Sequence, residues 1–440
     1  MRDYDPRRFG DYADKPWQVI KAKEDYCLRH EIPYPHFNRL DGRPVKPSPL
    51  YERLKDKGAV FEEVYGHERP RWFASSPLEP RDYYSFKRNE VHEVLAGEVS
   101  AVRNGAGIMD ISAFTKVEVN GPDAELFLES LVANNLPKKT GGIILTHFLN
   151  HRGRIELEAT VVRLDTDRYY LVCAAFFEQR LLDHLNKYKN DREVNIVNRS
   201  NDWGALTING PKSRDILSQC TDAALDNSNF RWMSAQHISI ANKPCWAFRM
   251  SYAGELGWEL HTPRENLLAV YDALWAAGES SGIKDYGSFA MNTMRMEKMF
   301  KGAGELTNEV TLPEADVMRF VKLDKDFIGK NQTRQSLEEQ MPWVCAYLQI
   351  EPNGTEDGNG GEAVLADGKV VGSTASITYG HSIGKVLAFA YIKPAAAKPG
   401  TRLTVVIAGA ERDAVVHDKP AYDPDSTLPR TDAGPRTDAG

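Results

Sequence analysis

Two carboxylates occupy positions where the sequence gives them a chemical use. The first, Glu255, lies between two glycines in "RMSYAGELGWELHT" (249–262). Glycine lets a flat ligand approach the backbone closely, and a carboxylate there can accept two parallel N–H bonds. A heterocycle with a ring N–H beside an exocyclic amine, such as a pterin or guanine edge, suits this arrangement. Tyr252 and Trp258 would supply flat apolar walls. The alternative is an exposed glutamate in a hairpin turn.

The second carboxylate is Glu158, in "GRIELEATVV" (153–162). Glu156 precedes it by two positions on a predicted strand, so we expect both side chains on the same side. A solvated outer face explains such a pair equally well. Glu158, however, directly precedes a run of residues that is typical of a buried strand. A carboxylate at the edge of such a run has its charge state set by its surroundings.

Other catalytic motifs do not stand out. The sequence has no GxGxxG fingerprint and no GxxxxGK[ST] loop, which argues against a self-contained flavin, nicotinamide or nucleotide domain. It also has no HExxH, CxxC or Cys/His cluster, so we predict no metal site. The cysteines are far apart and mostly inside apolar runs, which favours buried, unreactive thiols in a reducing cytoplasm. They are Cys27, Cys173, Cys220, Cys245 and Cys345.

Length and charge narrow the class of protein. The chain has 440 residues, which predicts two or three domains. The net charge is −7 and basic residues are scattered, so we expect no nucleic-acid partner. No run approaches eighteen apolar residues, and the charged start "MRDYDPRRFGDYADKPW" does not read as a signal peptide. We therefore predict no membrane association and a cytoplasmic location.

Residues 1–80 predict an N-terminal arm. This segment is rich in Pro, Tyr, Arg and Lys, with helices expected near 16–30 and 49–58. It lacks the apolar residues for a core of its own, so it must pack on a larger body.

The body itself is predicted over 81–340, and its sequence contains an internal repeat. "VEVNGPDAELFLESL" (117–131) and "LTINGPKSRDILSQC" (206–220) both read as strand, turn and helix. Two related β-turn-α units suggest a pseudo-symmetric α+β body with two halves. The alternative is that "NGP" is simply a good strand-to-helix turn. From 341 to 415 the chain turns mostly β and predicts a C-terminal barrel domain, and residues 416–440 predict a loose tail.

Several stretches, in this order, resemble the glycine-cleavage T-protein (aminomethyltransferase) superfamily. They are "GIMDISAFTKVEVNGPDAELFLESL", "FLNHRGRIELEATVVRL", "RMSYAGELGWEL", "MRMEKMFKGAGELTNEVTLPEADVMRF" and "YGHSIGKVLAFAYI". The chain is particularly similar to the folate domain of dimethylglycine and sarcosine dehydrogenases, over nearly all of residues 4–405. The resemblance implies an α+β fold with three subdomains around a central folate channel, a C-terminal β-barrel and tetrahydrofolate as cofactor.

The resemblance also implies roles for residues of the channel. Glu255 falls on the family's pterin-holding carboxylate, with Tyr252 before it, and Arg249 and Arg295 fall on arginines near the site. For Arg295 a structural salt bridge is an equal alternative. Glu158 falls where the family usually has an aspartate that acts on the folate nitrogen receiving the carbon.

The glutamate at position 158 is one departure from the family pattern. A second departure concerns the substrate pocket. Leu145-Thr146-His147 stands where an aromatic residue is usual. His147, Tyr379 and His381 are therefore candidates for substrate contact or proton delivery, although His147 fits a structural role equally well. We also count Trp258 among the candidate folate contacts.

The dehydrogenases that the chain resembles oxidise their substrates with a flavin half, and this sequence shows no such half. The combination predicts a tetrahydrofolate-dependent demethylase. We expect it to move a methyl group from a small methylated compound, in particular a methoxy-aromatic acid, to give 5-methyltetrahydrofolate. One alternative is the folate subunit of a flavin-linked N-methyl amine oxidase, whose flavin lies on a separate flavoprotein and whose product is methylene-tetrahydrofolate. Another is a non-catalytic folate-binding regulator.

Overall fold

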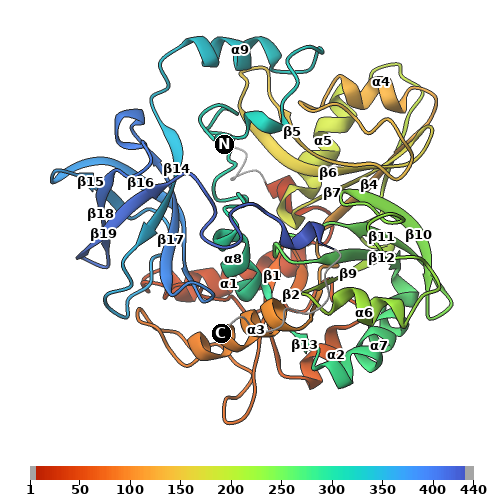
Figure 1. Cartoon of the computed structure of the whole chain (residues 1–440), viewed down its shortest axis with the longest axis horizontal. Helices are drawn as coiled ribbons and strands as arrows, with labels where there is room; N and C mark the ends of the chain where they lie inside the picture. Colours follow the sequence, from red (N-terminus) through yellow and green to blue (C-terminus); the bar gives the residue numbers. More distant parts are fainter. Residues whose placement is uncertain (1–5, 432–440) are drawn as a thin grey trace.

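The computed structural model describes residues 6–431. Figure 1 shows three β-rich lobes, with helix α8 (Ser288–Glu297) near the place where they meet. Two lobes are open sheets with helices packed on them, and the third is a closed barrel. This arrangement confirms the predicted aminomethyltransferase-like α+β fold.

The first open sheet has five strands in the order β5-β6-β7-β4-β8. Apolar side chains of β4, β6 and β7 line its buried face and pack against α5 around Leu157, Leu171 and Leu181. The elements are β4 Thr115–Asn120, α4 Ala124–Glu129, β5 Ile143–Leu149, β6 Ile155–Asp165, β7 Arg168–Cys173, α5 Glu178–Lys189 and β8 Asn195–Asn198.

The second open sheet has six strands in the order β10-β11-β12-β9-β3-β13. Its core gathers Leu206, Ile208 and Leu260 from the strands and Leu274 from helix α7. The elements are β3 Gly107–Asp110, β9 Trp203–Asn209, α6 Ser213–Ser218, β10 Ser234–Ile240, β11 Lys243–Arg249, β12 Gly257–Pro263, α7 Leu267–Gly278 and β13 Lys284–Asp285.

The two repeated segments, 117–131 and 206–220, occupy equivalent places in the two sheets. Strand β4 leads into α4 and lies next to β7, just as β9 leads into α6 and lies next to β12. Gly121 and Gly210, in the two "NGP" turns, have φ of 128° and 120°. A Cβ at either position would lie 2.4 Å from a backbone carbonyl oxygen. The repeated glycine is therefore required by the turn, and it marks two related halves.

The C-terminal domain is a closed barrel of six strands in the order β14-β17-β16-β15-β18-β19. In the sequence, this region shows alternating apolar runs that are separated by Asp-Gly and Pro-Gly turns. The predicted C-terminal barrel is confirmed. The strands are β14 Val344–Ile350, β15 Ala363–Ala366, β16 Lys369–Gly380, β17 Lys385–Ile392, β18 Arg402–Ile407 and β19 Ala410–His417.

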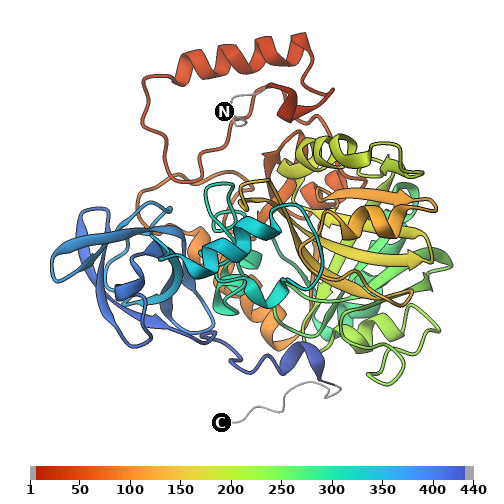
Figure 2. The same ribbon diagram turned by 90° about the horizontal axis from the view of Figure 1, so that it is seen from above.

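The N-terminal segment contains α1 (Lys15–Leu28) and α2 (Tyr51–Asp56), close to the predicted helices. Figure 2 shows α1 standing away from the rest of the chain, and none of its residues is buried. The structure differs after α2, where β1 (Ala59–Val64) and β2 (His67–Phe73) form a hairpin that the sequence analysis missed. A two-residue turn with positive φ joins the strands.

The remaining helices connect these parts. Helix α3 (Val91–Asn104) ends at Gly105, and α9 (Lys330–Glu338) precedes the barrel. Short 3₁₀ helices occupy Pro6–Phe9, Ala175–Phe177, Arg264–Asn266, Glu279–Ser281, Met318–Phe320, Pro394–Ala396 and Leu428–Arg430.

The prediction of a loose tail is wrong for the part of it that the structure describes. The Tyr422 amide donates to the Glu297 carbonyl at 3.0 Å, and Lys298 Nζ lies 2.8 Å from Asp423 Oδ2. The Asn227 side chain donates to the Arg430 carbonyl at 2.8 Å. The repetitive sequence at the very end of the chain suggested a loose tail, although the residues before it have specific polar partners. Residues 432–440 of the predicted tail lie outside the described residues.

Three further findings bear on the predicted class. Within residues 6–431, no helix has both the length and the apolar character needed to cross a bilayer, and no cluster of potential metal ligands occurs. All five cysteines are free thiols. Three of them are buried, whereas Cys220 is half-buried and Cys27 is exposed, so the expected burial does not hold for all five.

Candidate functional site

Glu255 lies in the loop between β11 and β12, and only 1% of its surface is exposed. Its Oε1 accepts hydrogen bonds from Arg103 Nη1 at 3.0 Å and from the Tyr422 hydroxyl at 2.9 Å. Arg103, from α3, also donates to Glu297 Oε2 at 2.7 Å. The Arg103 guanidinium lies 3.9 Å from the centre of the Tyr422 ring. Three distant parts of the chain therefore fix the orientation of this carboxylate.

The glycine before Glu255 is required by its surroundings. Gly254 has φ of 77°, and a Cβ there would lie 2.3 Å from Lys298 Cγ. The Lys298 side chain is fully buried and pairs with Asp423. The alternative of an exposed glutamate in a hairpin turn is therefore wrong, because the turn is packed under the C-terminal segment.

Tyr252 lies three residues before Glu255 and is part of the same wall. Its hydroxyl donates to the Lys301 carbonyl at 2.9 Å, and its ring stacks on Phe300 with centroids 6.0 Å apart. Burial raises the pKa of the Tyr252 hydroxyl well above its usual value. The Arg295 charge opposes this shift, and the charges of Glu158 and Glu305 add to it. Tyr252 is therefore close enough to Glu158 to sense its charge.

Arg295 forms the structural salt bridge that the sequence analysis gave as the alternative to a folate contact. Its Nη1 lies 2.9 Å from Glu305 Oε2 and donates to the Phe300 carbonyl at 3.0 Å. Both side chains are almost fully buried. Glu305 Oε1 is also buried and has no hydrogen bond within the described part of the chain. Glu305 thus has one buried oxygen whose hydrogen-bonding capacity the described residues do not use.

Glu158 and His147 face each other on adjacent strands. The register of β5 and β6 pairs them directly, and His147 Nε2 lies 3.2 Å from Glu158 Oε1. The angles at this contact are poor for a hydrogen bond, and both His147 ring nitrogens lack one among residues 6–431. The His147 side chain is fully buried, whereas 23% of the Glu158 side chain is exposed. The pair therefore joins a buried imidazole to a carboxylate that opens to solvent.

Glu156 does not share this place, contrary to the expectation from its spacing. A bulge between β5 and β6 leaves Glu156 without a pairing partner, because Phe148 pairs with Leu157 and Leu149 with Ile155. A bulge redirects the side chains beside it. Asn150 donates to Glu156 Oε1 at 3.1 Å, and Glu156 lines a hollow beside α5.

Arg249 and Trp258 are buried in the second half of the body. The Trp258 ring is fully buried and packs in the core with Phe230. Arg249 donates to the Phe230 carbonyl and lies 5.8 Å from the centre of the Trp258 ring. Core packing accounts for the burial of both residues, and their contact with folate stays a prediction.

Tyr379 and His381 lie at the end of β16, on the other side of α8 from Arg295. The Thr293 hydroxyl donates to the Tyr379 carbonyl at 3.3 Å. The His92 ring lies 4.8 Å from the Tyr379 ring and 4.6 Å from the His381 ring, measured between centroids. Burial, together with the charges of His92 and Arg88, lowers the pKa of His381 to about 4.

The structure therefore brings the predicted residues together in two groups. Tyr252 links the first group, because it shares a loop with Glu255 and the charges of Arg295 and Glu158 act on its hydroxyl. Tyr379 and His381 border a separate cavity. The residue after His381 connects the two, because Ser382 donates to Glu297 Oε2 at 2.7 Å and accepts from Arg103.

Sequence reasoning missed several residues of both groups. Arg103 is one residue of an ordinary amphipathic helix, and no sequence motif distinguishes it from its neighbours. Tyr422 stood in the predicted tail, and its apolar ring in a Pro-rich segment was the one available signal. The others are Glu297, Lys298, Glu305, Arg88 and His92.

Two family models match most of the chain, and a solved structure shares its fold. The GCVT N-terminal domain model matches residues 50–325, and the glycine cleavage T-protein C-terminal barrel domain model matches residues 345–423. The solved glycine cleavage system aminomethyltransferase T from Bartonella henselae superimposes with a TM-score of 0.74 at 23% identity. That alignment covers 86% of this chain and 98% of the solved one, and it shows the shared fold.

Two curated relatives are similar over almost the whole chain. "Dimethylglycine dehydrogenase, mitochondrial" from Homo sapiens is 34% identical over 95% of this chain and 49% of the relative. "4-methylaminobutanoate oxidase (formaldehyde-forming)" from Paenarthrobacter nicotinovorans is 30% identical over 96% of this chain and 51% of the relative. The chain thus spans about half the length of these two relatives.

Proposed function

The chain belongs to the glycine cleavage T-protein family, and from this premise we propose that it transfers a one-carbon unit to tetrahydrofolate. The observation that carries the proposal is the buried Glu255 carboxylate, oriented by Arg103 beside a wall that contains Tyr252. A buried charge with its partners in place is costly to maintain and marks a candidate functional site.

The residues of this region fit a flat polar heterocycle. Glu255 has the acceptor chemistry for the paired N–H groups of a pterin edge. Glu305 Oε1 and the two His147 ring nitrogens are buried atoms with no hydrogen bond among the described residues, and buried polar groups in proteins normally have one. Tetrahydrofolate supplies the ring nitrogen that receives the carbon. We assign Glu255 and Tyr252 to holding the pterin.

Glu158 and His147 are proposed to handle the proton of the reaction. A carboxylate that opens to solvent beside a buried imidazole provides a proton acceptor next to a path to bulk water. Glu158 is one methylene longer than the family's usual aspartate, so its carboxylate reaches further from the strand. His147, directly opposite, occupies the space on the neighbouring strand that would limit this reach.

We propose two sources for the carbon. In the first, a methoxy-aromatic acid donates its methyl group directly. The carbon–oxygen bond breaks, a bond to the folate nitrogen forms, and the proton from that nitrogen ends on the phenol oxygen. The product is 5-methyltetrahydrofolate. The departure at Leu145-Thr146-His147 favours this source, because it indicates a substrate pocket that differs from that of the amine enzymes.

In the second, a separate flavoprotein oxidises an N-methyl amine, and the released carbon is captured as methylene-tetrahydrofolate. The names of the relatives favour this source, since they include a dimethylglycine dehydrogenase and a 4-methylaminobutanoate oxidase.

One experiment tests the function and separates the two sources. The purified chain is incubated with tetrahydrofolate and a panel of methoxybenzoates, dimethylglycine and sarcosine, with and without an added N-methyl amine oxidase. 5-Methyltetrahydrofolate formed without the oxidase supports direct demethylation. Methylene-tetrahydrofolate that forms faster with the chain than with oxidase alone supports the second source. If neither folate product exceeds the control without the chain, the proposed function is wrong.

A further inference from the structure

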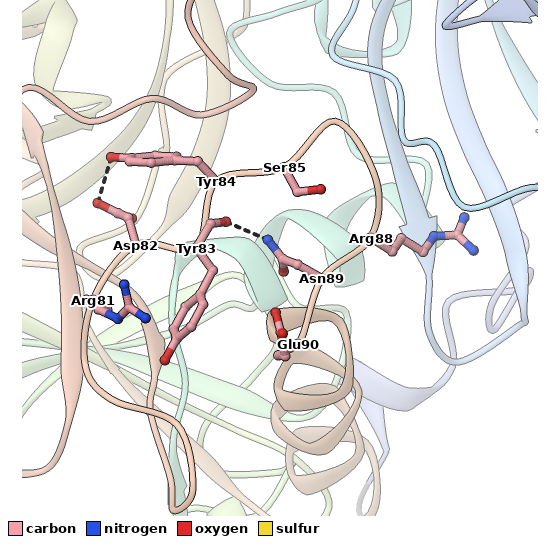
Figure 3. A pocket seen from close by; sticks show the side chains of 8 residues that line it. All are labelled: Arg81, Asp82, Tyr83, Tyr84, Ser85, Arg88, Asn89 and Glu90. Atoms are coloured by element: carbon pink, nitrogen blue, oxygen red, sulfur yellow. Dashed lines mark hydrogen bonds between the residues drawn. The ribbon is translucent and has the colours of Figure 1, made fainter.

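A cavity of about 180 Å³ lies between α3, α8, the barrel and the segment before α3. It adjoins an open hollow, and Tyr83, Tyr84 and Arg88 border both. Figure 3 shows that Arg88 is turned away from Arg81 and Asp82, toward the strands of the barrel.

Three basic side chains gather on one side of this cavity. The Arg88 guanidinium lies 4.4 Å from the centre of the Tyr379 ring, and the His92 and His381 rings are 4.6 Å apart. Burial and the Arg88 charge both lower the pKa of His92, and the same causes act on His381. Each group therefore disfavours a positive charge on the others, and an anion placed among them would relieve this repulsion.

This cluster has hydrogen-bonding capacity that the described residues do not use. Arg88 Nη2 is buried and has no hydrogen bond within residues 6–431. Asp357 accepts from Arg88 Nε at 2.9 Å and is the acid nearest to the cluster, with Glu93 close to His92. Asp357 holds one edge of the guanidinium and leaves the Nη2 edge for a ligand.

Apolar and aromatic side chains also line the cavity. Phe289, Leu95 and Ile377 line it, together with the Tyr379 ring. An engineered protein cavity of about 150 Å³ holds benzene, so a volume of about 180 Å³ fits a single ring with a small substituent and is too small for a folate. Size and charge thus select a compact ligand with one flat ring and one negative group.

We propose that this cavity binds a small aromatic monocarboxylate, with its carboxylate between Arg88, His92 and His381 and its ring against Tyr379 and Phe289. The site is distinct from the Glu255 region, and its occupation requires no folate. The proposal goes beyond the one-carbon reaction, since it is tested by binding alone. A carboxylate here would receive charge-assisted hydrogen bonds, which are about twice as strong as neutral ones.

The test is calorimetric titration of the full chain with benzoate and with benzamide, in the absence of tetrahydrofolate. The two probes have similar shapes and differ in charge. We expect benzoate to bind at one site, and benzamide to bind about tenfold more weakly or not at all. His381→Gln and His92→Gln should each weaken benzoate binding about tenfold. His237→Gln, at an exposed position on β10, is the control and should leave affinity unchanged.

A second readout is the uptake of protons on binding. A bound carboxylate raises the pKa of His381 from about 4, so binding near pH 6 should take up a fraction of a proton. The heat of binding will then depend on the ionisation enthalpy of the buffer, and this dependence should shrink in His381→Gln. The other titratable or charged groups facing the cluster are Arg88, His92, Asp357 and Glu93.

Three results would overturn the proposal. They are the absence of benzoate binding by the wild-type chain, equal affinity for benzamide and benzoate, and unchanged benzoate affinity in His381→Gln. Each leaves the proposed folate reaction untouched, because no folate is present. Conversely, a chain that fails to bind tetrahydrofolate but binds benzoate would retain this site and lose the proposed function.

Discussion

Arg103 Nη1 and Glu255 Oε1 lie 3.0 Å apart, and both side chains are at least nine-tenths buried. The contact joins α3 to the loop before β12, and the other end of the guanidinium binds Glu297 on α8. A single cation thus holds two buried carboxylates from two different elements. Its removal leaves both negative charges without their partner in a low-dielectric environment.

We therefore expect Arg103→Met to reduce the free energy of unfolding by about 3–5 kcal/mol, as is usual when one partner of a buried pair is removed. Urea unfolding followed by circular dichroism measures this. Arg53→Met is the matched control, because Arg53 and Asp272 form an ion pair with both side chains more than 40% exposed. The control should cost less than about 1 kcal/mol. Equal losses in the two variants would contradict the assigned role of Arg103.

Glu255→Gln is expected to reduce tetrahydrofolate affinity about tenfold to a hundredfold, because the pterin N–H groups lose a charged acceptor. The glutamine keeps an oxygen for Arg103, which also retains Glu297, so most of the fold's stability should remain. Calorimetry with tetrahydrofolate gives the affinity, and a thermal melt checks the fold. Glu265→Gln, at an exposed position, serves as the control. Unchanged folate affinity in Glu255→Gln would remove the pterin assignment.

Asp423→Asn tests whether the C-terminal segment is part of the folded body. Lys298 is fully buried and pairs with Asp423, so the loss of the carboxylate charge should lower the free energy of unfolding by about 2 kcal/mol. Asp425→Asn, two residues away and exposed, should have almost no effect. A loose tail would give the same small change for both variants in a urea titration.

Glu158→Gln is expected to reduce the rate of the one-carbon transfer about 10²–10⁴-fold while leaving tetrahydrofolate affinity nearly unchanged. The reason is that the amide keeps the shape and loses the ability to take a proton. Glu158→Asp should recover part of the rate, and single-turnover product formation measures all three proteins. Glu156→Gln is the control, since the bulge directs Glu156 to a different hollow. An equal loss in the Glu156 variant would argue against a specific role for Glu158.

Glu98 predicts a dependence of stability on pH. Its carboxyl accepts hydrogen bonds from the Phe73 and Gly287 amides, but burial dominates and raises its pKa to about 8. The folded state therefore binds this proton more tightly than the unfolded state. Its contribution to stability is greatest below about pH 4.5 and is lost as the pH rises toward 8.

Glu98→Gln removes the titrating group, so the free energy of unfolding of the wild type minus that of the variant should fall between pH 5 and pH 8. Urea titrations at several pH values give this difference. A difference that stays constant, or that rises with pH, would contradict the raised pKa.

The fold could be predicted from the sequence where local sequence preferences and tertiary packing favour the same structure. The "NGP" turns were visible because only glycine fits their positive φ, and the barrel strands because they alternate and end in turn residues. The β1–β2 hairpin was missed because its strands are rich in charged residues. Those residues are held by ion pairs such as Arg69 with Glu62, which hydrophobic patterning does not reveal.

The site was accessible only in part, for a different reason. Glu255 and Glu158 stand out locally, because one lies between glycines and the other borders a buried run. Their partners come from far along the chain: Arg103 is 152 residues from Glu255, and Tyr422 is 167. The spacing of Glu156 and Glu158 also misled, since a bulge depends on the opposite strand and leaves no mark in its own sequence.

Calorimetric titration of the purified full chain with tetrahydrofolate tests the central claim most directly. The account predicts saturable binding at one site, reduced about tenfold or more in Glu255→Gln and unaffected by Glu265→Gln. A wild-type chain that is folded by circular dichroism and shows no binding of reduced folate would contradict it.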